Sequence, residues 1–462
     1  MPSHSKSLFV SKVKNPDAEA IPVFKGDSAK VPESAQADFK GDVGEVLFLY
    51  PEKTKTRLAL VGLGDPEKVT KETLRRSYGA LAKAAIKKKL KSLTIDPPKI
   101  DGLSQSQVIE GAAEGILFSN YHFGKYQQEP KGLLQEIGLK GVKPETETLF
   151  QAVNFARDLV NGDADEITPD VLAKEAKKLG SGKVLNKAAL KKEKMGLMLA
   201  VSKGSVHEPY LIALEYRGNP KSKEKICLIG KGVTYDTGGL NLKSVSMETM
   251  KADMGGAAAV LGAFKAAKEL KLKVNLSVVV PTVENAIGSG SYKPGSVYPS
   301  HSGKSVEIGN TDAEGRLILA DAISWAKKHV KPTQIIDCAT LTGAMRVAIG
   351  DEGMGLFSNN DALADSLVNA GMETFERAFR FPLIEEYKEE LKSDVADICN
   401  IGKGRLAGAI TAALFLEAFI GDTPWAHLDM APSAFITSEK RYYPKFATGI
   451  GVRLLVEYLR HV

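Results

Sequence analysis

Disulfide-forming cysteines and long apolar runs are both scarce in this sequence. The three cysteines, Cys227, Cys338 and Cys399, are far apart and odd in number. This argues against a disulfide framework and predicts buried free thiols in a reducing compartment. The best late apolar run, residues 408–420, is too short to span a bilayer and contains Glu417. We therefore expect a cytoplasmic protein with no membrane partner.

A large excess of charge of one sign is also lacking. The chain of 462 residues carries 62 Lys and Arg against 56 Asp and Glu, a net charge of +6. That excess is too small by itself to indicate nucleic-acid binding. With 43% apolar and 26% charged residues, the composition excludes a wholly disordered, collagenous or coiled-coil chain. The length allows two or three domains with a large buried core.

Histidine is scarce as well, and familiar catalytic signatures are incomplete. The seven histidines are scattered, so we expect no histidine cluster that could hold a metal or serve a nucleophile. The dinucleotide, phosphate-loop and zinc-protease signatures each miss an essential residue, because Glu67, Tyr298 and Leu211 stand in the required positions. These near misses leave carboxylate chemistry as the remaining possibility.

Alternating apolar runs and helical stretches predict an α/β fold in the first third of the chain. Strands are predicted at 46–50, 58–61 and 93–96, and helices at 71–89 and 106–119. A long polar helix at about 145–160 is predicted to link two lobes. We expect a smaller N-terminal α/β domain over residues 1–150.

The second half repeats this alternation on a larger scale. Its near-continuous apolar strands, separated by helices, predict a central, mostly parallel sheet covered on both faces. We expect a larger C-terminal α/β catalytic domain over residues 151–462. The predicted strands are 226–229, 274–280, 335–336 and 426–428, and the predicted helices are 257–270, 316–329 and 407–419.

Three carboxylate-rich segments lie in loops of this second half, where ligands of parallel sheets bind. The segment 230–243 directly follows a predicted strand, and the segments 250–256 and 310–317 each precede a predicted helix. For Asp253 and Asp312 the alternative interpretation is helix capping, with Arg316 paired to Asp312. The functional groups in these segments are Lys231, Asp236, Lys243, Asp253, Asp312, Glu314 and Arg316.

Taken in order, the segments GKGVTYDTGGLNLK, MKADMGGAA and NTDAEGRLILADA closely resemble the leucyl (cytosol) aminopeptidases, a family of two-metal, hexameric enzymes. The resemblance is dense over residues 225–345 and extends through nearly all of the second half. The first 150 residues match only in their general α/β character. Asn161-Gly162-Asp163 departs from the Asn-Glu-Pro or Asn-Thr-Pro usual in the family.

The resemblance implies a two-metal site. Asp236 and Glu314 would bridge two divalent ions, Asp312 would complete the more exchangeable site, and Lys231 and Asp253 would complete the tighter one. The implied ions are zinc, with manganese able to occupy the exchangeable site, although oxygen ligands alone do not choose between such metals. Lys231 could ligate only as a neutral amine, so its pKa would have to fall well below ~10.4.

The resemblance also implies the catalytic groups. A metal-bridged hydroxide would attack the scissile carbonyl, Lys243 would face the developing oxyanion, and Arg316 would hold bicarbonate as the general base. The tighter metal and Asp253 would bind the free α-amine of the substrate. The pocket for the first side chain would be apolar and weakly selective. Its predicted lining is Met250, Thr340, Leu341, Gly343, Ala431 and Ala434.

We therefore expect a metal-dependent homohexameric aminopeptidase that removes N-terminal Leu and other apolar residues from peptides. Lysines cluster at residues 87–91 and 174–194, where helical spacing favours solvated helix faces over a phosphate-binding patch. The alternative function is a DNA-binding regulator, alone or as a second role of the same hexamer. A two-metal phosphoesterase is a further alternative, because it shares the ion chemistry.

Overall fold

The computed structural model describes residues 7–52, 54–404 and 406–462. These residues form two compact units. The first unit contains the chain up to Gln151 together with the later segment Thr437–Lys445. The second unit contains Ala152–Ile436 and Phe446–Val462. The passage between the units falls inside helix α3, Pro144–Asn161.

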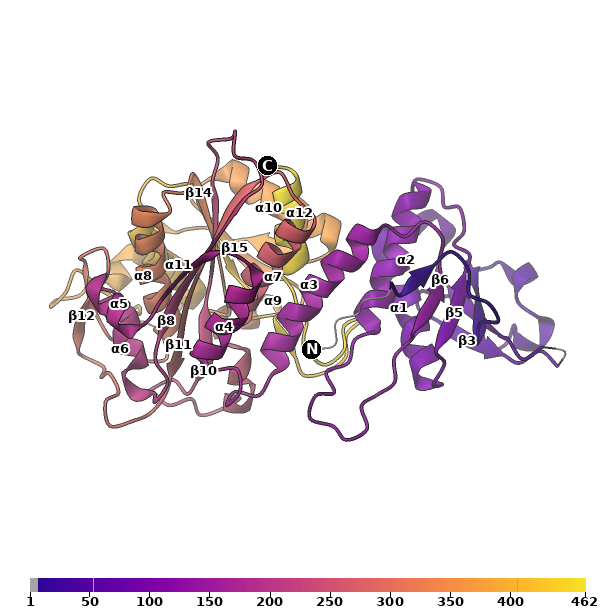
Figure 1. Ribbon diagram of the computed structural model, residues 1–462, viewed down its shortest axis with the longest axis horizontal. Coiled ribbons are helices and arrows are strands. Elements are labelled where there is room, and N and C mark those ends of the chain that lie inside the picture. Colours follow the sequence, from indigo (N-terminus) through magenta and orange to yellow (C-terminus); the bar gives the residue numbers. More distant parts are fainter. Residues whose placement is uncertain (1–6, 53, 405) are drawn as a thin grey trace. The chain divides into compact units, whose positions relative to one another are not determined.

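The first unit is built on a six-stranded sheet. All neighbouring strands in it are parallel except the edge pair β3 and β4, which is antiparallel. Two helices, α1 (Lys71–Lys87) and α2 (Gln105–Ser119), accompany the sheet (Figure 1). In spatial order the strands are β1 (Phe9–Val10), β6 (Glu136–Gly138), β5 (Ser92–Ile95), β2 (Ala18–Val23), β4 (Arg57–Gly62) and β3 (Val46–Leu49).

Local signals explain where these two helices begin and where α1 ends. Helix α1 starts after a capping box, in which the Thr70 side chain accepts the Thr73 N–H and the reverse bond is also made. Helix α2 starts after the equivalent box at Ser104. Helix α1 ends two residues earlier than the sequence predicts, since Lys89 adopts a φ of 59°, which a right-handed helix cannot contain.

The second unit contains a nine-stranded sheet whose centre is parallel. Strands β18, β14, β9 and β11 run parallel to one another, and β10 pairs parallel with β11. Strands β8, β7 and β15 join in antiparallel fashion at the flanks. The spatial order is β16 (Ala378–Arg380), β15 (Met354–Ser358), β18 (Trp425–Asp429), β14 (Gln334–Ala339), β9 (Ile226–Gly230), β11 (Asn275–Asn285), β8 (Tyr210–Arg217) and β7 (Gly182–Leu185), with β10 (Gly232–Asp236) beside β11.

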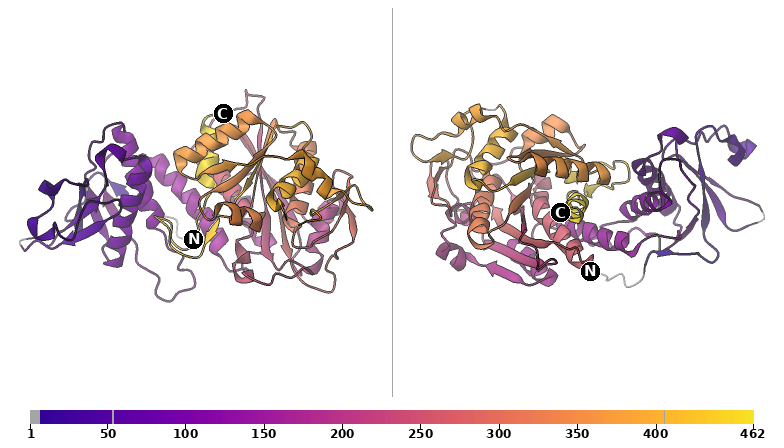
Figure 2. Two further views of the ribbon diagram at one scale, coloured as in Figure 1. Left: turned by 180° about the vertical axis from the view of Figure 1, so that it is seen from behind. Right: turned by 90° about the horizontal axis from the view of Figure 1, so that it is seen from above.

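Helices cover both faces of this sheet (Figure 1). On one face lie α5 (Lys187–Lys192), α6 (Gly196–Val201), α8 (Glu314–His329) and α11 (Gly408–Ile420). On the other face lie α4 (Pro169–Leu179), α7 (Gly255–Glu269), α10 (Asp361–Thr374) and α12 (Val452–Arg460). Figure 2 shows the same layering from behind and from above. The predicted α/β fold with a largely parallel central sheet is confirmed.

Shorter elements complete the second unit. Helix α9, Gly343–Ile349, follows β14, and the 3₁₀ helix η5, Met247–Ala252, precedes α7. A small sheet joins β12 (Val297–Pro299), β13 (Ser305–Glu307) and β17 (Ile398–Cys399), and a two-stranded sheet joins β19 (Phe435–Ile436) and β20 (Phe446–Ala447).

The topology positions a site at one edge of the larger sheet. Strands β9, β10, β11, β14 and β18 run in the same direction, so their carboxyl ends share that edge. Asp236, Asn285 and Asp429 are the last residues of β10, β11 and β18, and Lys231 and Thr340 directly follow β9 and β14.

Candidate metal centre

Lys231 links two carboxylates in the deeper half of the site. Its Nζ lies 2.8 Å from Asp253 Oδ1 and 2.9 Å from Glu314 Oε1, and it donates to the Thr340 carbonyl oxygen at 2.9 Å. Thr340 Oγ1 also donates to Asp253 Oδ1 at 2.8 Å. Gly315 makes room for this arrangement, because a Cβ there would lie 2.7 Å from Lys231 Nζ.

Lys243 links two other carboxylates in the more open half. Its Nζ lies 2.7 Å from Asp236 Oδ2 and 2.6 Å from Asp312 Oδ1. Asp236 is held by two donors to its Oδ1, the Gly238 N–H and Asn285 Nδ2, both at 2.8 Å. Gly238 adopts a φ of 84°, which favours glycine and lets the chain turn back sharply after Asp236.

Carboxylates of the two halves also approach one another. Buried oxygen atoms of Asp236, Asp253 and Glu314 all lie within 4.8 Å of one another. Asp253 Oδ2 and Glu314 Oε2 are buried and have no hydrogen-bond partner among the residues described. Unsatisfied buried oxygens are costly unless something else binds them. The donor set of carboxylates and one amine, with two free oxygens, therefore fits divalent cations.

The charges of the site are out of balance. Four carboxylates, those of Asp236, Asp253, Asp312 and Glu314, face two lysines, which leaves an excess of two negative charges. Burial and the nearby Glu314 raise the pKa of Asp236 to about 7. Burial, followed in effect by repulsion from Glu314, also raises the pKa of Asp253 and of Asp312. Bound cations would favour the ionised carboxylates and so lower their pKa values.

Lysine charge compensates for burial at the remaining groups. Burial opposes ionisation of Glu314, but Lys231 and Lys243 outweigh it and hold the pKa of Glu314 below its usual value. Burial likewise opposes protonation of Lys231, yet Asp253 and Glu314 outweigh it and raise the pKa of Lys231. With only these side chains present, Lys231 is therefore an ammonium group, and ligation of a metal would require it to lose a proton.

The capping interpretations of the two acidic loops are wrong. Helix α7 has Met254 as its N-cap and helix α8 has Ala313, and neither residue makes a side-chain capping bond. The carboxylates of Asp253 and Asp312 face lysines instead. In the described part of the chain, no ion pair joins Asp312 to Arg316.

Arg316 lies in the first turn of α8 and is buried. Its Nη1 donates to the Asn400 carbonyl oxygen at 2.9 Å, and its buried Nε has no partner among the residues described. Burial lowers the pKa of Arg316 to about 10, so the group is still charged at pH 7. A charged guanidinium with an unused donor can bind an anion.

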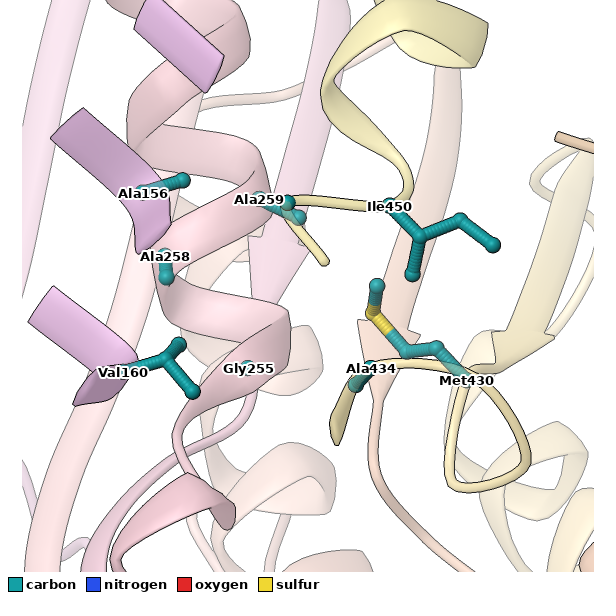
Figure 3. A pocket seen from close by; sticks show the side chains of 9 residues that line it. Ala156, Val160, Gly255, Ala258, Ala259, Met430, Ala434 and Ile450 are labelled. Atoms are coloured by element: carbon teal, nitrogen blue, oxygen red, sulfur yellow. The ribbon is translucent and has the colours of Figure 1, made fainter. Parts of the chain in front are cut away.

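The predicted pocket residues come from separate loops at the same edge of the sheet. Met250 lies in η5, Thr340 and Leu341 follow β14, Gly343 begins α9, and Ala431 follows β18. Ala434 lines a small apolar cavity with Met430, Gly255 and neighbouring residues (Figure 3). The cavity measures about 10 Å³, room for one water molecule and not for a leucine side chain.

Two supporting residues escaped the sequence analysis. Asn285, fully buried at the end of β11, bonds both Asp236 Oδ1 and the Thr311 carbonyl oxygen. Asp429, at the end of β18, accepts the N–H groups of Leu341 and Thr342 and the hydroxyl of Thr342. Both lie at carboxyl ends of strands, and that position is the signal that could have identified them.

The expectation that the histidines form no cluster is also wrong. Glu193, His301 and His329 each bring a ligand atom within 4.8 Å of the others. Their spacing along the chain gave no hint of this.

Among the three cysteines, all free, Cys227 and Cys338 are buried and Cys399 is half-buried, which is more exposed than predicted.

Comparison with known proteins settles the family. The catalytic-domain model of the cytosol aminopeptidase family matches residues 154–456, and the N-terminal-domain model of the same family matches residues 9–130. This chain belongs to the cytosol aminopeptidase family. The resemblance found in the sequence is confirmed, and membership makes the chain an aminopeptidase and therefore a hydrolase.

Relatives of the cytosol aminopeptidase family match over almost the whole chain. A probable cytosol aminopeptidase of Protochlamydia amoebophila is 46% identical, covering 99% of this chain and 98% of the relative. One from Chlamydia muridarum is 47% identical, with 97% and 94% covered. The solved structure of the bottromycin maturation enzyme BotP is similar with a TM-score of 0.89 and 31% identity, covering 96% of this chain and 99% of that one. A structure of BotP in complex with Mn gives the same values.

No helix among the described residues of this cytosol aminopeptidase family member is both long and apolar enough to cross a membrane.

Proposed function

We propose that this aminopeptidase is metal-dependent and removes N-terminal Leu and other apolar residues from peptides with broad specificity. The observation that carries the proposal is the cluster of Asp236, Asp253 and Glu314, whose buried oxygens lie within 4.8 Å of one another. Two divalent ions, zinc or manganese, would supply an activated water and polarise the scissile carbonyl.

The residues that would hold the ions follow from the two halves of the site. Asp236 and Glu314 would be shared, Asp312 would serve the more open position, and Lys231 with Asp253 the deeper one. The depth difference supports this division, since Asp312 has a side chain 34% exposed and Asp253 one 7% exposed. The more open position would exchange its ion more readily.

Asp253 is also suited to recognise the free amine of the substrate. Its Oδ1 is used by Lys231 and Thr340, but its buried Oδ2 has no partner among the described residues. A protonated or hydrogen-bonded α-amine could satisfy that oxygen. Only a chain terminus carries such an amine, which would restrict cleavage to the first peptide bond.

Lys243 and Arg316 would act on the reacting groups. Lys243 Nζ, paired with two carboxylates and only 17% exposed, would donate to the oxyanion of the tetrahedral intermediate. Donors of this kind contribute about 2.7–4 kcal/mol. Arg316, with its unused Nε, would hold bicarbonate, which would accept the proton of the attacking water.

Substrate preference would come from the loops that carry Met250, Thr340, Leu341, Gly343 and Ala431. Small residues beside a flexible methionine would leave an apolar space for the first side chain of the peptide. Ala434, which lines a small apolar cavity, would add to this apolar surface. One methylene changes binding by only ~1–3 kcal/mol, so discrimination between Leu and Met would be weak.

The decisive experiment compares Asp236→Ala with Asp361→Ala, whose parent side chain is 85% exposed on α10. Turnover of leucine anilide and bound metal are measured for both variants and the unchanged protein. We expect at least a roughly 1000-fold loss of turnover and a loss of metal in Asp236→Ala alone. Unchanged turnover and metal content in that variant would overturn the proposal.

The two alternative functions need separate assays. Hydrolysis of a phosphate ester by the metal-loaded protein, without anilide turnover, would favour a phosphoesterase. Duplex DNA binding at low salt would support the regulator, because phosphate contacts are strongest there. Lys174 and Lys178 pair with Asp170 and Glu175 on the same helix, which favours solvated helix faces. The homohexamer and the cytoplasmic location stay predictions, to be checked by sedimentation and cell fractionation.

A further inference from the structure

Glu193, His301 and His329 converge on the second unit, far along the chain from the candidate metal centre. Helix α5 ends at Lys192 with Glu193 as its C-cap, His301 lies in the loop between β12 and β13, and His329 is the last residue of α8. Figure 1 shows α5, β12 and α8 on the same side of this unit. Three separate segments therefore meet at one point.

The distances suit one small cation. Glu193 Oε2 lies 2.9 Å from His329 Nε2 and 3.7 Å from His301 Nε2. Ligand atoms of a tetrahedral zinc ion, at ~2.0–2.1 Å from the metal, are about 3.3 Å apart. Shifts of a few tenths of an ångström would bring both contacts to that value.

His301 has the most buried side chain of the three residues. Its side chain is only 4% exposed, and both ring nitrogens are buried without a hydrogen-bond partner among the described residues. Its backbone N–H donates to Asp321 Oδ1 at 2.7 Å, which holds the loop against α8. A buried imidazole with both nitrogens unsatisfied is unusual. A metal would supply the missing partner for Nε2.

The other two ligands are also held in place. The ring of His329 stacks on Trp325, one turn earlier in α8, with ring centroids 4.8 Å apart. Glu193 is held at the end of α5, where its N–H bonds to the Ala189 carbonyl oxygen. Side chains held before a metal arrives lose little entropy on binding it.

We propose that Glu193, His301 and His329 form an additional metal site that takes one zinc ion or a similar first-row divalent cation. Two imidazoles and one carboxylate are a donor set that zinc favours. The His329 side chain is 33% exposed, so a water molecule can complete the coordination from solvent. The ion would tie together α5, the loop before β13 and the end of α8.

Lys328 is the neighbour that opposes a cation. Its Nζ lies 3.4 Å from Glu193 Oε2, but its side chain is 60% exposed and can move into solvent. It will weaken the affinity without blocking the site. Burial, with a contribution from Lys328, lowers the pKa of His301 below its ordinary value, so the ring is neutral at pH 7.

The additional site is independent of the candidate metal centre. Helix α8 carries Glu314 at its first position and His329 at its last. At 1.5 Å per residue these positions are roughly 22 Å apart along the helix axis. The two sites share no ligand, so the additional site can be tested whether or not the proposed function holds.

The first test counts zinc bound by the full-length, metal-stripped protein after dialysis against zinc chloride. The variants are Glu193→Gln and His329→Gln, and the control is His461→Gln. His461 also pairs with a glutamate, Glu457, at 3.0 Å, but the described residues offer it no third ligand. We expect the first two variants to bind one zinc ion fewer per chain than the unchanged protein and the control. Equal zinc contents in all four proteins would overturn the proposal.

The second test uses the unchanged protein, so misfolding of a variant cannot obscure it. Carbethoxylation of histidines is mapped by mass spectrometry with and without zinc chloride. We expect zinc to slow modification of His329 at least tenfold and to leave His461 unaffected. Equal protection of both residues, or of neither, would contradict an additional site.

Discussion

Each unit of the protein contains a cluster of charged side chains, and among the described residues only one of the two clusters has equal numbers of basic and acidic groups. In the first unit, Arg75 on α1 lies 2.6 Å from Glu114 on α2 and 3.5 Å from Glu72. Arg76 adds a contact to Glu72, and Lys71 contacts Glu114 and the neighbouring Glu110. Among the described residues, these contacts join three basic side chains to three carboxylates. The cluster in the second unit has four carboxylates and two lysines.

This difference separates a structural role from a functional one. A balanced cluster needs no further ion, and this one joins helices α1 and α2. An acid-rich cluster in which two oxygens have no partner among the described residues is complete only when a cation binds it. The same residue types therefore indicate packing in one unit and cation binding in the other, and charge balance is the quantity that distinguishes them.

The largest expected effect comes from replacing Lys231 by Arg. The charge count is unchanged, but a guanidinium cannot become neutral at any accessible pH and is bulkier beside Gly315. If the deeper ion needs a neutral amine, turnover of leucine anilide should fall at least about 1000-fold with loss of one metal ion per chain. Full activity of Lys231→Arg would show that the amine is only a counter-charge, as in the first unit.

Breaking the balanced cluster should affect stability instead. Arg75→Met leaves Glu114 buried without its closest cation, so we expect a loss of about 3–5 kcal/mol in the stability of the first unit. Arg76→Met is the matched control, because Arg76 is 39% exposed, and should lose about 1 kcal/mol or less. Hydrogen exchange of the α1 and α2 amides measures both. The amount of bound metal should be unchanged. A loss of metal would show that the cluster in the first unit is not purely structural.

Removing one carboxylate from the acid-rich cluster should instead increase the stability of the metal-free protein. In Asp253→Asn, the amide oxygen can still accept from Lys231 and Thr340 while the excess negative charge is reduced. We expect the metal-free variant to be more stable than the metal-free parent by about 0.5–2 kcal/mol, measured by calorimetry after chelation. Metal binding and turnover should be lost. A less stable metal-free variant would mean that the carboxylate is structural.

The smallest expected effect concerns a separate buried ion pair in the second unit, formed by His427 and Asp337. Burial opposes protonation of His427, but Asp337 Oδ1, 2.6 Å from Nδ1, outweighs it and raises the pKa of His427 above 6.5. This stabilisation is complete below about pH 6.5 and is lost as pH rises through the folded-state pKa.

Asp337→Asn should therefore reduce the melting temperature most at pH 6, and less at pH 9. Each unit of pKa difference corresponds to about 1.4 kcal/mol. The asparagine can still accept a bond from Trp425 Nε1, which donates to Asp337 Oδ2 in the parent. Calorimetry at both pH values measures the effect, and a difference independent of pH would show that the pair is not ionised.

Much of the fold could be predicted from the sequence, because periodic patterns report burial directly. The buried strands β9, β14 and β18 have every or nearly every residue buried, and their apolar runs were visible along the chain. Shorter strands such as β1 and β20, with two residues each, have no pattern long enough to detect. They form because tertiary neighbours supply their hydrogen bonds.

The candidate metal centre was predictable in part for a similar reason. Its acidic residues lie in three compact segments that follow strands or precede helices, so the topology predicted their meeting. Asn285 and Asp429 were missed because single polar residues at strand ends carry no motif. Glu193, His301 and His329 were missed because more than a hundred residues separate Glu193 from His301, and no local pattern connects them.

The sequence alone determined the α/β class, the family and the acidic segments, since apolar periodicity and short motifs are properties of neighbouring residues. Only the tertiary structure decided which carboxylates lack a counter-charge and which histidines lie close together. Charge balance and ligand geometry depend on distances between atoms that are remote along the chain. Folding sets those distances, and the order of residues does not display them.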